Sequence, residues 1–390
     1  MNPLDVDRLR AETAGCNEVL HFNNAGAALP PDPVHHAVVA HLELERRIGG
    51  YEAKARADDA LAGFYTSAAK LLNAHPDEIA FVENATRAWD MAFYAVPFQP
   101  GDRILTSEAE YSSNVLAFLQ MQRRRGVGID VVPSHPDGRL DVAALERMLD
   151  DRVKLVAVTH IPTYNGLIQD AAAIGAVTRR HGALYLLDAC QSAGQVPLDV
   201  AAIGCDMLSA TGRKYLRGPR GTGLLYVRRA VLDRLEPPFV DLHAAEWVAA
   251  DRFELRPDAK RFENWEFYVA GKLGLKAAID YALALGVDAL EARIRDLADQ
   301  LRHRLHDEPT IHLRDPEAAT AGLVTFTKTD EAAEAVMARL RRASINVSVS
   351  SGAAHFDPHR RAFGAAVRAS VHAYNTRAEI DRFVAALTAG

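Results

Sequence analysis

The sequence predicts an α/β protein with a large domain, built on a mainly parallel sheet covered by helices, and a smaller C-terminal α/β domain. Apolar strand-like runs alternate with helix-like segments through the first half of the chain. These runs lack polar alternation, as in residues 183–188, which is typical of parallel strands buried on both faces. After Val227 the composition changes, and 390 residues suffice for two domains.

The chain divides into three expected parts. Residues 1–20 are predicted to form a short amphipathic helix that packs on the small domain. The large domain is expected to span residues 21–265, and a bridging helix opens the small domain, residues 266–390. The expected strands of the large domain are residues 79–82, 103–106, 128–132, 155–159, 183–188 and the runs 206–210 and 223–227. Its expected helices are residues 59–72, 83–95, 112–125, 141–150 and 170–181. In the small domain we expect helices at 266–285, 288–307, 331–342 and 377–388, with strands at 322–327, 345–349 and 366–371.

Composition excludes several classes of protein. Hydrophobic residues make up 49% and charged residues 25%, and no apolar run is long enough to span a bilayer. A net charge of −6 without a basic block argues against nucleic acid as the main partner. Because the first residues lack a basic head and an apolar stretch, we expect a cytoplasmic protein. The three cysteines show no paired metal-ligand spacing and are expected to be reduced thiols.

Polar or aromatic side chains follow five successive predicted strands. Parallel α/β sheets bind ligands at the carboxyl ends of their strands, so these side chains are expected to meet. Ala85 and Thr86 open a helix directly after a strand, where free N–H groups and the helix dipole form an anion site. A simple helix cap is the alternative at this junction.

A glycine-rich turn between two apolar strands carries Lys214. Its alternative interpretation is a basic surface hairpin in which Arg213, Arg217 and Arg220 are solvated. Asp188 ends a buried strand, and a buried carboxylate is costly unless it meets a cation. A Schiff-base lysine, an aspartate for a protonated pyridine nitrogen and a helix N-terminus for a phosphate together indicate a pyridoxal 5'-phosphate site.

Two motifs carry a family resemblance. They are residues 187–194, Leu-Asp-Ala-Cys-Gln-Ser-Ala-Gly, and residues 211–214, Thr-Gly-Arg-Lys, with 26 residues from Asp188 to Lys214. From about residue 20 to the C-terminus the chain resembles the class V aminotransferase and cysteine desulfurase family of fold-type I pyridoxal phosphate enzymes, in its isopenicillin N epimerase-like branch. The resemblance implies a homodimer that acts on a small α-amino acid substrate.

The resemblance assigns cofactor roles by position. Lys214 is expected to hold the cofactor and to act as the catalytic base, Asp188 to hold the ring nitrogen, and Gln191 to bind the phenolic oxygen. Tyr111 stands where the family usually has a ring-stacking histidine, and Thr163 stands where many members have an asparagine. The expected phosphate-binding residues are Ala85, Thr86 and Thr211.

The resemblance also assigns the substrate pocket. Arg368 matches the arginine that clamps the substrate carboxylate, a task suited to its planar fork. Asn24 and Trp265 are expected to line the pocket. The Gly-Thr pair that often follows Arg-Phe-Glu in the family, and reaches the partner subunit's phosphate, is replaced by Asn264 and Trp265.

The segment where desulfurases present a mobile catalytic cysteine, residues 345–355, contains no cysteine. Without a thiolate there, sulfur cannot be taken up as a protein persulfide by the usual route. A carbon–sulfur β-lyase acting on a cysteine derivative is therefore the favoured function, and an aminotransferase using a 2-oxo acid is the main alternative. An epimerase, a cysteine desulfurase of the usual kind and a non-catalytic cofactor-binding sensor rank lower.

Overall fold

A seven-stranded sheet forms the centre of the large domain in the computed structural model, which describes residues 4–350 and 355–389. The strand order is β2 (Ile79–Val82), β8 (Gly223–Val227), β7 (Met207–Thr211), β6 (Leu184–Asp188), β5 (Val153–Thr159), β3 (Arg103–Ser107) and β4 (Gly128–Val132). Strand β8 runs antiparallel to both of its neighbours, whereas the other pairs are parallel. The predicted mainly parallel sheet is confirmed.

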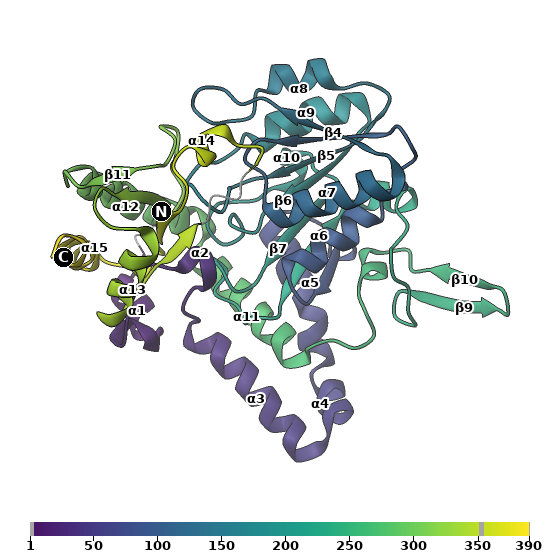
Figure 1. Cartoon of the computed structure of the whole chain (residues 1–390). Helices are drawn as coiled ribbons and strands as arrows, with labels where there is room; N and C mark the ends of the chain where they lie inside the picture. Colours follow the sequence, from purple (N-terminus) through teal and green to yellow (C-terminus); the bar gives the residue numbers. More distant parts are fainter. Residues whose placement is uncertain (1–3, 351–354, 390) are drawn as a thin grey trace.

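Helices cover both faces of this sheet (Figure 1). In β6, Leu184 and Leu186 pack into one core, while Tyr185 and Leu187 pack into the other, because successive side chains of a strand point to opposite faces. One face is covered by α6 (Ala85–Tyr94) and α7 (Ser112–Arg125). The other is covered by α5 (Asp58–Leu72), α8 (Val142–Met148), α9 (Ala171–His181) and α11 (Val269–Leu285).

Helix boundaries follow from local capping. Asp141 and Asp170 each accept a hydrogen bond from a backbone N–H of the helix that follows them, which satisfies a free donor. Gly126 and Gly182 end α7 and α9 in the left-handed conformation that glycine adopts without strain. The shorter helical elements are α2 (Asn24–Ala27), η2 (Pro76–Glu78), α10 (Val200–Ile203), η3 (Arg229–Arg234) and η4 (Ala259–Phe262).

A separate antiparallel sheet lies toward the C-terminus, in the order β11 (Ile311–Leu313), β12 (Leu323–Lys328), β15 (Ala366–Ser370) and β14 (Ser348–Ser350). The helices of this part, which lies at the left of Figure 1, are α12 (Val287–His306), α13 (Ala333–Arg342), α14 (Pro358–Arg361) and α15 (Arg377–Thr388). Because the two sheets are separate, we propose that the large domain ends at residue 265 and the small domain begins at residue 266, as expected from the sequence.

The N-terminal segment is not one helix, and that expectation was wrong. It forms α1 (Val6–Ala11), a 3-10 turn η1 (Ala14–Asn17) and β1 (Leu20–His21). Thr13 leaves helical geometry between the first two, and its hydroxyl donates back to the Leu9 carbonyl. Strand β1 pairs with β13 (Ile345–Asn346), and Arg10 lies 2.7 Å from Glu379 in α15.

Two parts of the large domain were not anticipated. Helices α3 (Asp32–Ile48) and α4 (Gly50–Arg56) occupy a stretch that the sequence left unassigned. Strands β9 (Ala245–Ala249) and β10 (Arg252–Leu255) pair as a hairpin in the stretch after Val227 where the composition changes, and this hairpin projects from the body (Figure 1). In the described residues no helix is both long enough and apolar enough to cross a membrane.

Candidate active site

A cavity of about 450 Å³ opens at the carboxyl ends of β5, β6 and β7, beside the start of α6. It brings together most of the residues that the sequence singled out. Its lining residues are Asn84, Ala85, Thr86, Tyr111, Asn114, Thr159, Ile161, Thr163, Asp188, Cys190, Gln191, Thr211, Arg213, Lys214, Arg220 and Gly221.

Lys214 is buried at the wall of this cavity. Burial lowers the pKa of its ammonium group, and the side chain makes no hydrogen bond or ion pair with any described residue. The turn that carries it is not a surface hairpin. Arg217 is buried, donates to Leu29 O at 2.8 Å and stacks over Tyr374 at 4.8 Å, so of the three arginines only Arg220 is exposed.

Asp188 lies buried at the last position of β6. One of its carboxylate oxygens accepts from the Cys190 backbone N–H at 2.9 Å, and the other accepts from Asn114 Nδ2 at 3.1 Å. Both contacts come from donors, which suits an anionic carboxylate and fixes its orientation. The site therefore holds a fixed negative charge at the end of a central strand.

The start of α6 forms another wall of the cavity. Asn84 caps the helix by accepting from Arg87 N at 2.8 Å. Strand β8 approaches closely, since a Cβ on Gly223 would lie 3.1 Å from Ala85 N. The guanidinium groups of Arg213 and Arg220 line the same cavity and pair with no described residue. A helix N-terminus of this length with two unpaired cations favours an anion.

Gln191, Thr163 and Arg368 form one connected group. Arg368 Nη1 donates to the Thr163 carbonyl at 2.6 Å and to its hydroxyl at 2.8 Å. Gln191 Nε2 donates to Ala25 O at 3.1 Å and to Thr163 Oγ1 at 3.3 Å, while its buried Oε1 has no hydrogen-bond partner among the described residues. Arg368 is buried, which lowers its pKa to about 10, and its Nε has no hydrogen-bond partner in the described part of the chain. It does not itself line the cavity but contacts Thr163, which does.

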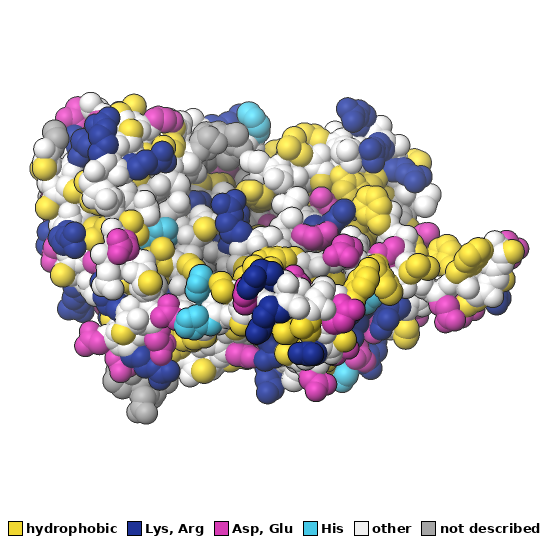
Figure 2. Space-filling view, turned by 90° about the horizontal axis from the view of Figure 1, so that it is seen from below, with side chains coloured by type: hydrophobic (Ala, Val, Ile, Leu, Met, Phe, Trp, Pro, Cys, Tyr) yellow, Lys and Arg dark blue, Asp and Glu magenta, His cyan; other side chains and the backbone are white. Residues whose placement is uncertain are grey.

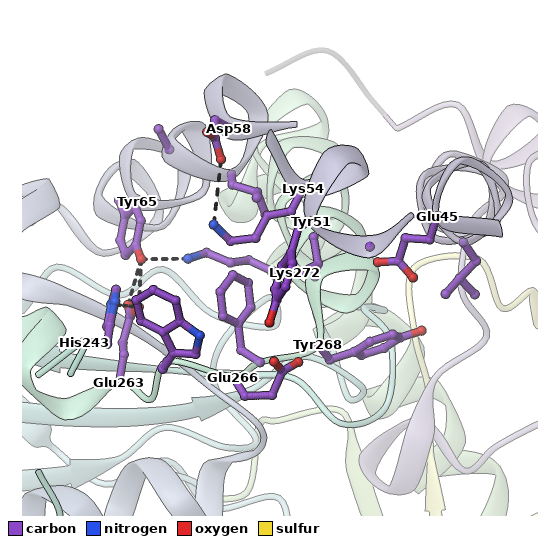
Figure 3. A pocket seen from close by; sticks show the side chains of 17 residues that line it. Glu45, Tyr51, Lys54, Asp58, Tyr65, His243, Glu263, Glu266, Tyr268 and Lys272 are labelled. Carbon is purple, nitrogen blue, oxygen red and sulfur yellow. Dashed lines mark hydrogen bonds and ion pairs between the residues drawn. The ribbon is translucent and has the colours of Figure 1, made fainter. Parts of the chain in front are cut away.

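Asn24 and Trp265 are not brought to this cavity within one chain. Asn24 is buried, donates to Ser370 O at 2.7 Å and accepts from the Tyr374 hydroxyl, so it joins α2 to the small domain. Trp265 is exposed and lines a different cavity of about 980 Å³, shown in Figure 3.

The floor of that second cavity is a self-contained polar cluster. Lys272 Nζ donates to the Tyr65 hydroxyl at 2.7 Å, and that hydroxyl donates to Glu263 at 2.9 Å. His243 Nε2 lies 3.2 Å from the other Glu263 oxygen. Figure 3 shows these four side chains converging at the left of the view, with Tyr51 and Tyr268 to their right. These four side chains therefore form one connected hydrogen-bonded group at the floor of the cavity.

None of the three cysteines is placed to act as a thiolate. Burial raises the pKa of Cys190 to about 12, and it also raises the pKa of Cys205 and of Cys16. Residues 351–354 of the segment without a cysteine lie outside the described residues.

Sequence reasoning assigned no role to Asn114, Glu110, Arg213 or Arg220. The two arginines lie near Lys214 in the sequence, so their positive charge could have indicated an anion site. The contact of Asn114 with Asp188 joins positions 74 residues apart, and only the folded sheet brings them together.

The residues of the first cavity fit pyridoxal phosphate. A buried lysine without a counter-ion can bond to its carbonyl carbon, and Asp188 offers the anion that a pyridinium requires. The unpaired guanidiniums and the α6 terminus suit its phosphate. The assignment of these individual residues is our proposal.

A family model described as Aminotransferase class-V matches residues 20–383. A probable cysteine desulfurase of Methanothermobacter thermautotrophicus is 32% identical over 372 residues, covering 93% of this chain and 92% of the relative. The apo structure of a cysteine desulfurase from Thermococcus onnurineus is 27% identical, with a TM-score of 0.90 and coverage of 97% of this chain and 96% of that one.

A third comparison concerns the fold. The cystine C–S lyase C-DES, solved in complex with its reaction product cysteine persulfide, is 24% identical, has a TM-score of 0.87 and covers 96% of this chain and 98% of that chain. The family match spans nearly the whole chain, and the solved structure with a TM-score of 0.90 shares its fold. This chain belongs to the class-V aminotransferase family and is a pyridoxal phosphate-dependent enzyme of fold type I.

Proposed function

We propose that this enzyme cleaves the carbon–sulfur bond of cysteine or a cysteine derivative by β-elimination, without a protein persulfide. The observation that supports this proposal is that Lys214 and Asp188 line one cavity, while burial raises the pKa of all three thiols and residues 345–355 contain no cysteine. The relatives named as cysteine desulfurases support a sulfur-containing substrate.

Bound pyridoxal phosphate would supply an electron-withdrawing ring that acidifies the substrate Cα–H. Lys214 would accept this proton at Nζ, a role that its lowered pKa favours because more of the amine is neutral. Asp188 would keep the ring nitrogen protonated. Arg368, held by Thr163, would bind the substrate carboxylate through its remaining N–H groups.

The elimination balances without a protein thiol. The proton leaves Cα, the Cβ–S bond breaks, and its electron pair departs on sulfur. After protonation the sulfur is released as hydrogen sulfide from cysteine, as a thiol from an S-alkyl cysteine or as a hydropersulfide from cystine. The carbon skeleton leaves as 2-aminoacrylate, and water hydrolyses it to pyruvate and ammonia. No oxidant is needed.

Product analysis tests this proposal against its alternatives. The purified enzyme is incubated separately with cysteine, cystine and an S-alkyl cysteine, with and without a 2-oxo acid. We expect pyruvate and ammonia in equal amounts, independent of the 2-oxo acid. Alanine with protein-bound sulfur would instead show a desulfurase, and amino transfer that requires the 2-oxo acid would show an aminotransferase. Lys214→Ala serves as the inactive control.

We also propose that a second copy of this chain covers the aromatic face around the second cavity. Tyr51 is 76% exposed and Trp265 is 60% exposed at its rim, and Trp247 is 72% exposed on the projecting hairpin. Figure 2 shows hydrophobic side chains on this hairpin at the right of the view. A lone two-stranded hairpin is only marginally stable in water, so a partner surface would support it.

Light scattering on the eluting protein measures this assembly. We expect twice the chain mass of 42.6 kDa, and a shift toward the monomer for Trp247→Asp combined with Trp265→Asp. A monomeric wild-type chain would contradict the proposal.

A further inference from the structure

Behind Asp188 lies a second buried carboxylate, Glu110, in the loop between β3 and α7. It is linked to Asp188 through a single side chain. Asn114 Nδ2 donates to Glu110 Oε1 at 2.8 Å and to Asp188 Oδ2 at 3.1 Å. Because both partners only accept, the amide of Asn114 has one favourable orientation, and it bridges the two carboxylates.

Glu110 is itself held by the backbone of two strand ends. Its oxygens accept from Tyr111 N at 2.8 Å, from Thr159 N at 3.1 Å and from Thr106 Oγ1 at 3.1 Å. The Thr159 hydroxyl is also in contact with it. The two backbone N–H groups and the Asn114 amide can only donate, so this arrangement is built for the anionic form.

The charge of this group has no counter-ion among the described residues. Asp188 is the charged side chain that faces it, and the other contacts come from neutral donors. Burial, with a contribution from Asp188, raises the pKa of Glu110 to about 7 despite these hydrogen bonds. Two neighbouring buried anions are unfavourable unless a cation lies close to them.

We propose that Glu110 is a positioning residue for the cofactor's ring nitrogen. Through Asn114 it orients Asp188, and it adds a second negative charge behind the point where a pyridinium binds. The proposal rests on the cofactor site proposed above, but not on the choice between elimination and transamination.

The test compares two ligands that differ only at the ring nitrogen. Cofactor-free enzyme is titrated with pyridoxal phosphate and with an analogue that has carbon in place of this nitrogen, followed by absorbance and tryptophan fluorescence. The ratio of the two dissociation constants reports the interaction at the nitrogen. A general loss of packing would weaken both ligands and leave this ratio unchanged.

We expect Glu110→Gln to reduce the preference for the nitrogen-containing ligand about tenfold, equivalent to one pKa unit. Asn114→Ser should reduce it as well, because it removes the bridge and keeps both carboxylates. The matched control is Glu108→Gln, in the same loop but lining a different cavity, and it should keep the wild-type ratio. A wild-type ratio in Glu110→Gln would overturn the proposal. If that variant does not fold, a wild-type ratio in Asn114→Ser would overturn it.

Since no substrate is present, an error in the proposed reaction would not affect the result. A wild-type chain that bound neither ligand would refute the cofactor site, and the role of Glu110 with it.

Discussion

Replacing Glu110 by glutamine should change how the stability of the cofactor-free enzyme depends on pH. Burial raises the pKa of this carboxyl from 4.5 to about 7. A carboxyl whose pKa is raised on folding binds its proton more tightly in the folded chain. The contribution of this carboxyl to the free energy of unfolding is therefore complete below pH 4.5 and is lost as the pH rises through 7. At about 1.4 kcal/mol per pKa unit, the loss amounts to about 3 kcal/mol.

The assay is urea unfolding of both proteins at several values between pH 5 and pH 8. The amide N–H groups of the glutamine face the N–H groups that donate to Glu110 in the wild type. This destabilises the variant by an amount that does not depend on pH. Other buried groups, such as Asp315 and His160, titrate alike in both proteins and cancel in the difference. We expect the difference in unfolding free energy between the wild type and the variant to fall by about 2–3 kcal/mol from pH 5 to pH 8, slightly less than the full loss because pH 5 already lies above 4.5. A difference that stays constant with pH would refute the reasoning.

Three further substitutions probe the site. Arg368→Lys should raise KM for the amino acid about tenfold or more, because lysine lacks the guanidinium fork, while cofactor affinity stays unchanged; an unaltered KM would refute the clamp. Cys190→Ser should keep the rate of pyruvate formation within about twofold, since the thiol is protonated and takes no sulfur. Loss of sulfur release in that variant would contradict the proposed route. Arg220→Ala should weaken cofactor binding about tenfold, measured by titration at two salt concentrations, and identical affinities would exclude a phosphate contact.

The sheet could be predicted because its strands are buried on both faces. Residues 184–188 have no exposed face, and the resulting apolar run is easily recognised. Helix α3 and the hairpin β9–β10 carry exposed apolar side chains such as Val39 and Trp247. The apolar residues of these elements therefore do not follow the spacing of an element that packs one face on the core of its own chain. The interface with a second copy that we propose above would blur the amphipathic signal on which sequence interpretation depends.

The candidate site was predictable where motif residues are close in sequence. Asp188, Gln191, Thr211 and Lys214 all line the cavity as expected. Residues placed by long-range packing were not predictable. From the sequence Asn24 is expected to line the pocket, yet its amide forms hydrogen bonds only within the core. The bridge from Glu110 to Asp188 forms only when the ends of three strands meet in the folded sheet.

The central claim is that Lys214 bonds to the cofactor. Borohydride treatment of the loaded enzyme fixes whichever amine is bonded to the cofactor's carbonyl carbon, and mass spectrometry of the digested protein locates it. We predict the reduced pyridoxyl phosphate group on Lys214, with no label in Lys214→Ala. A label on another lysine, such as the buried Lys272, or the same labelling in Lys214→Ala, would contradict the account.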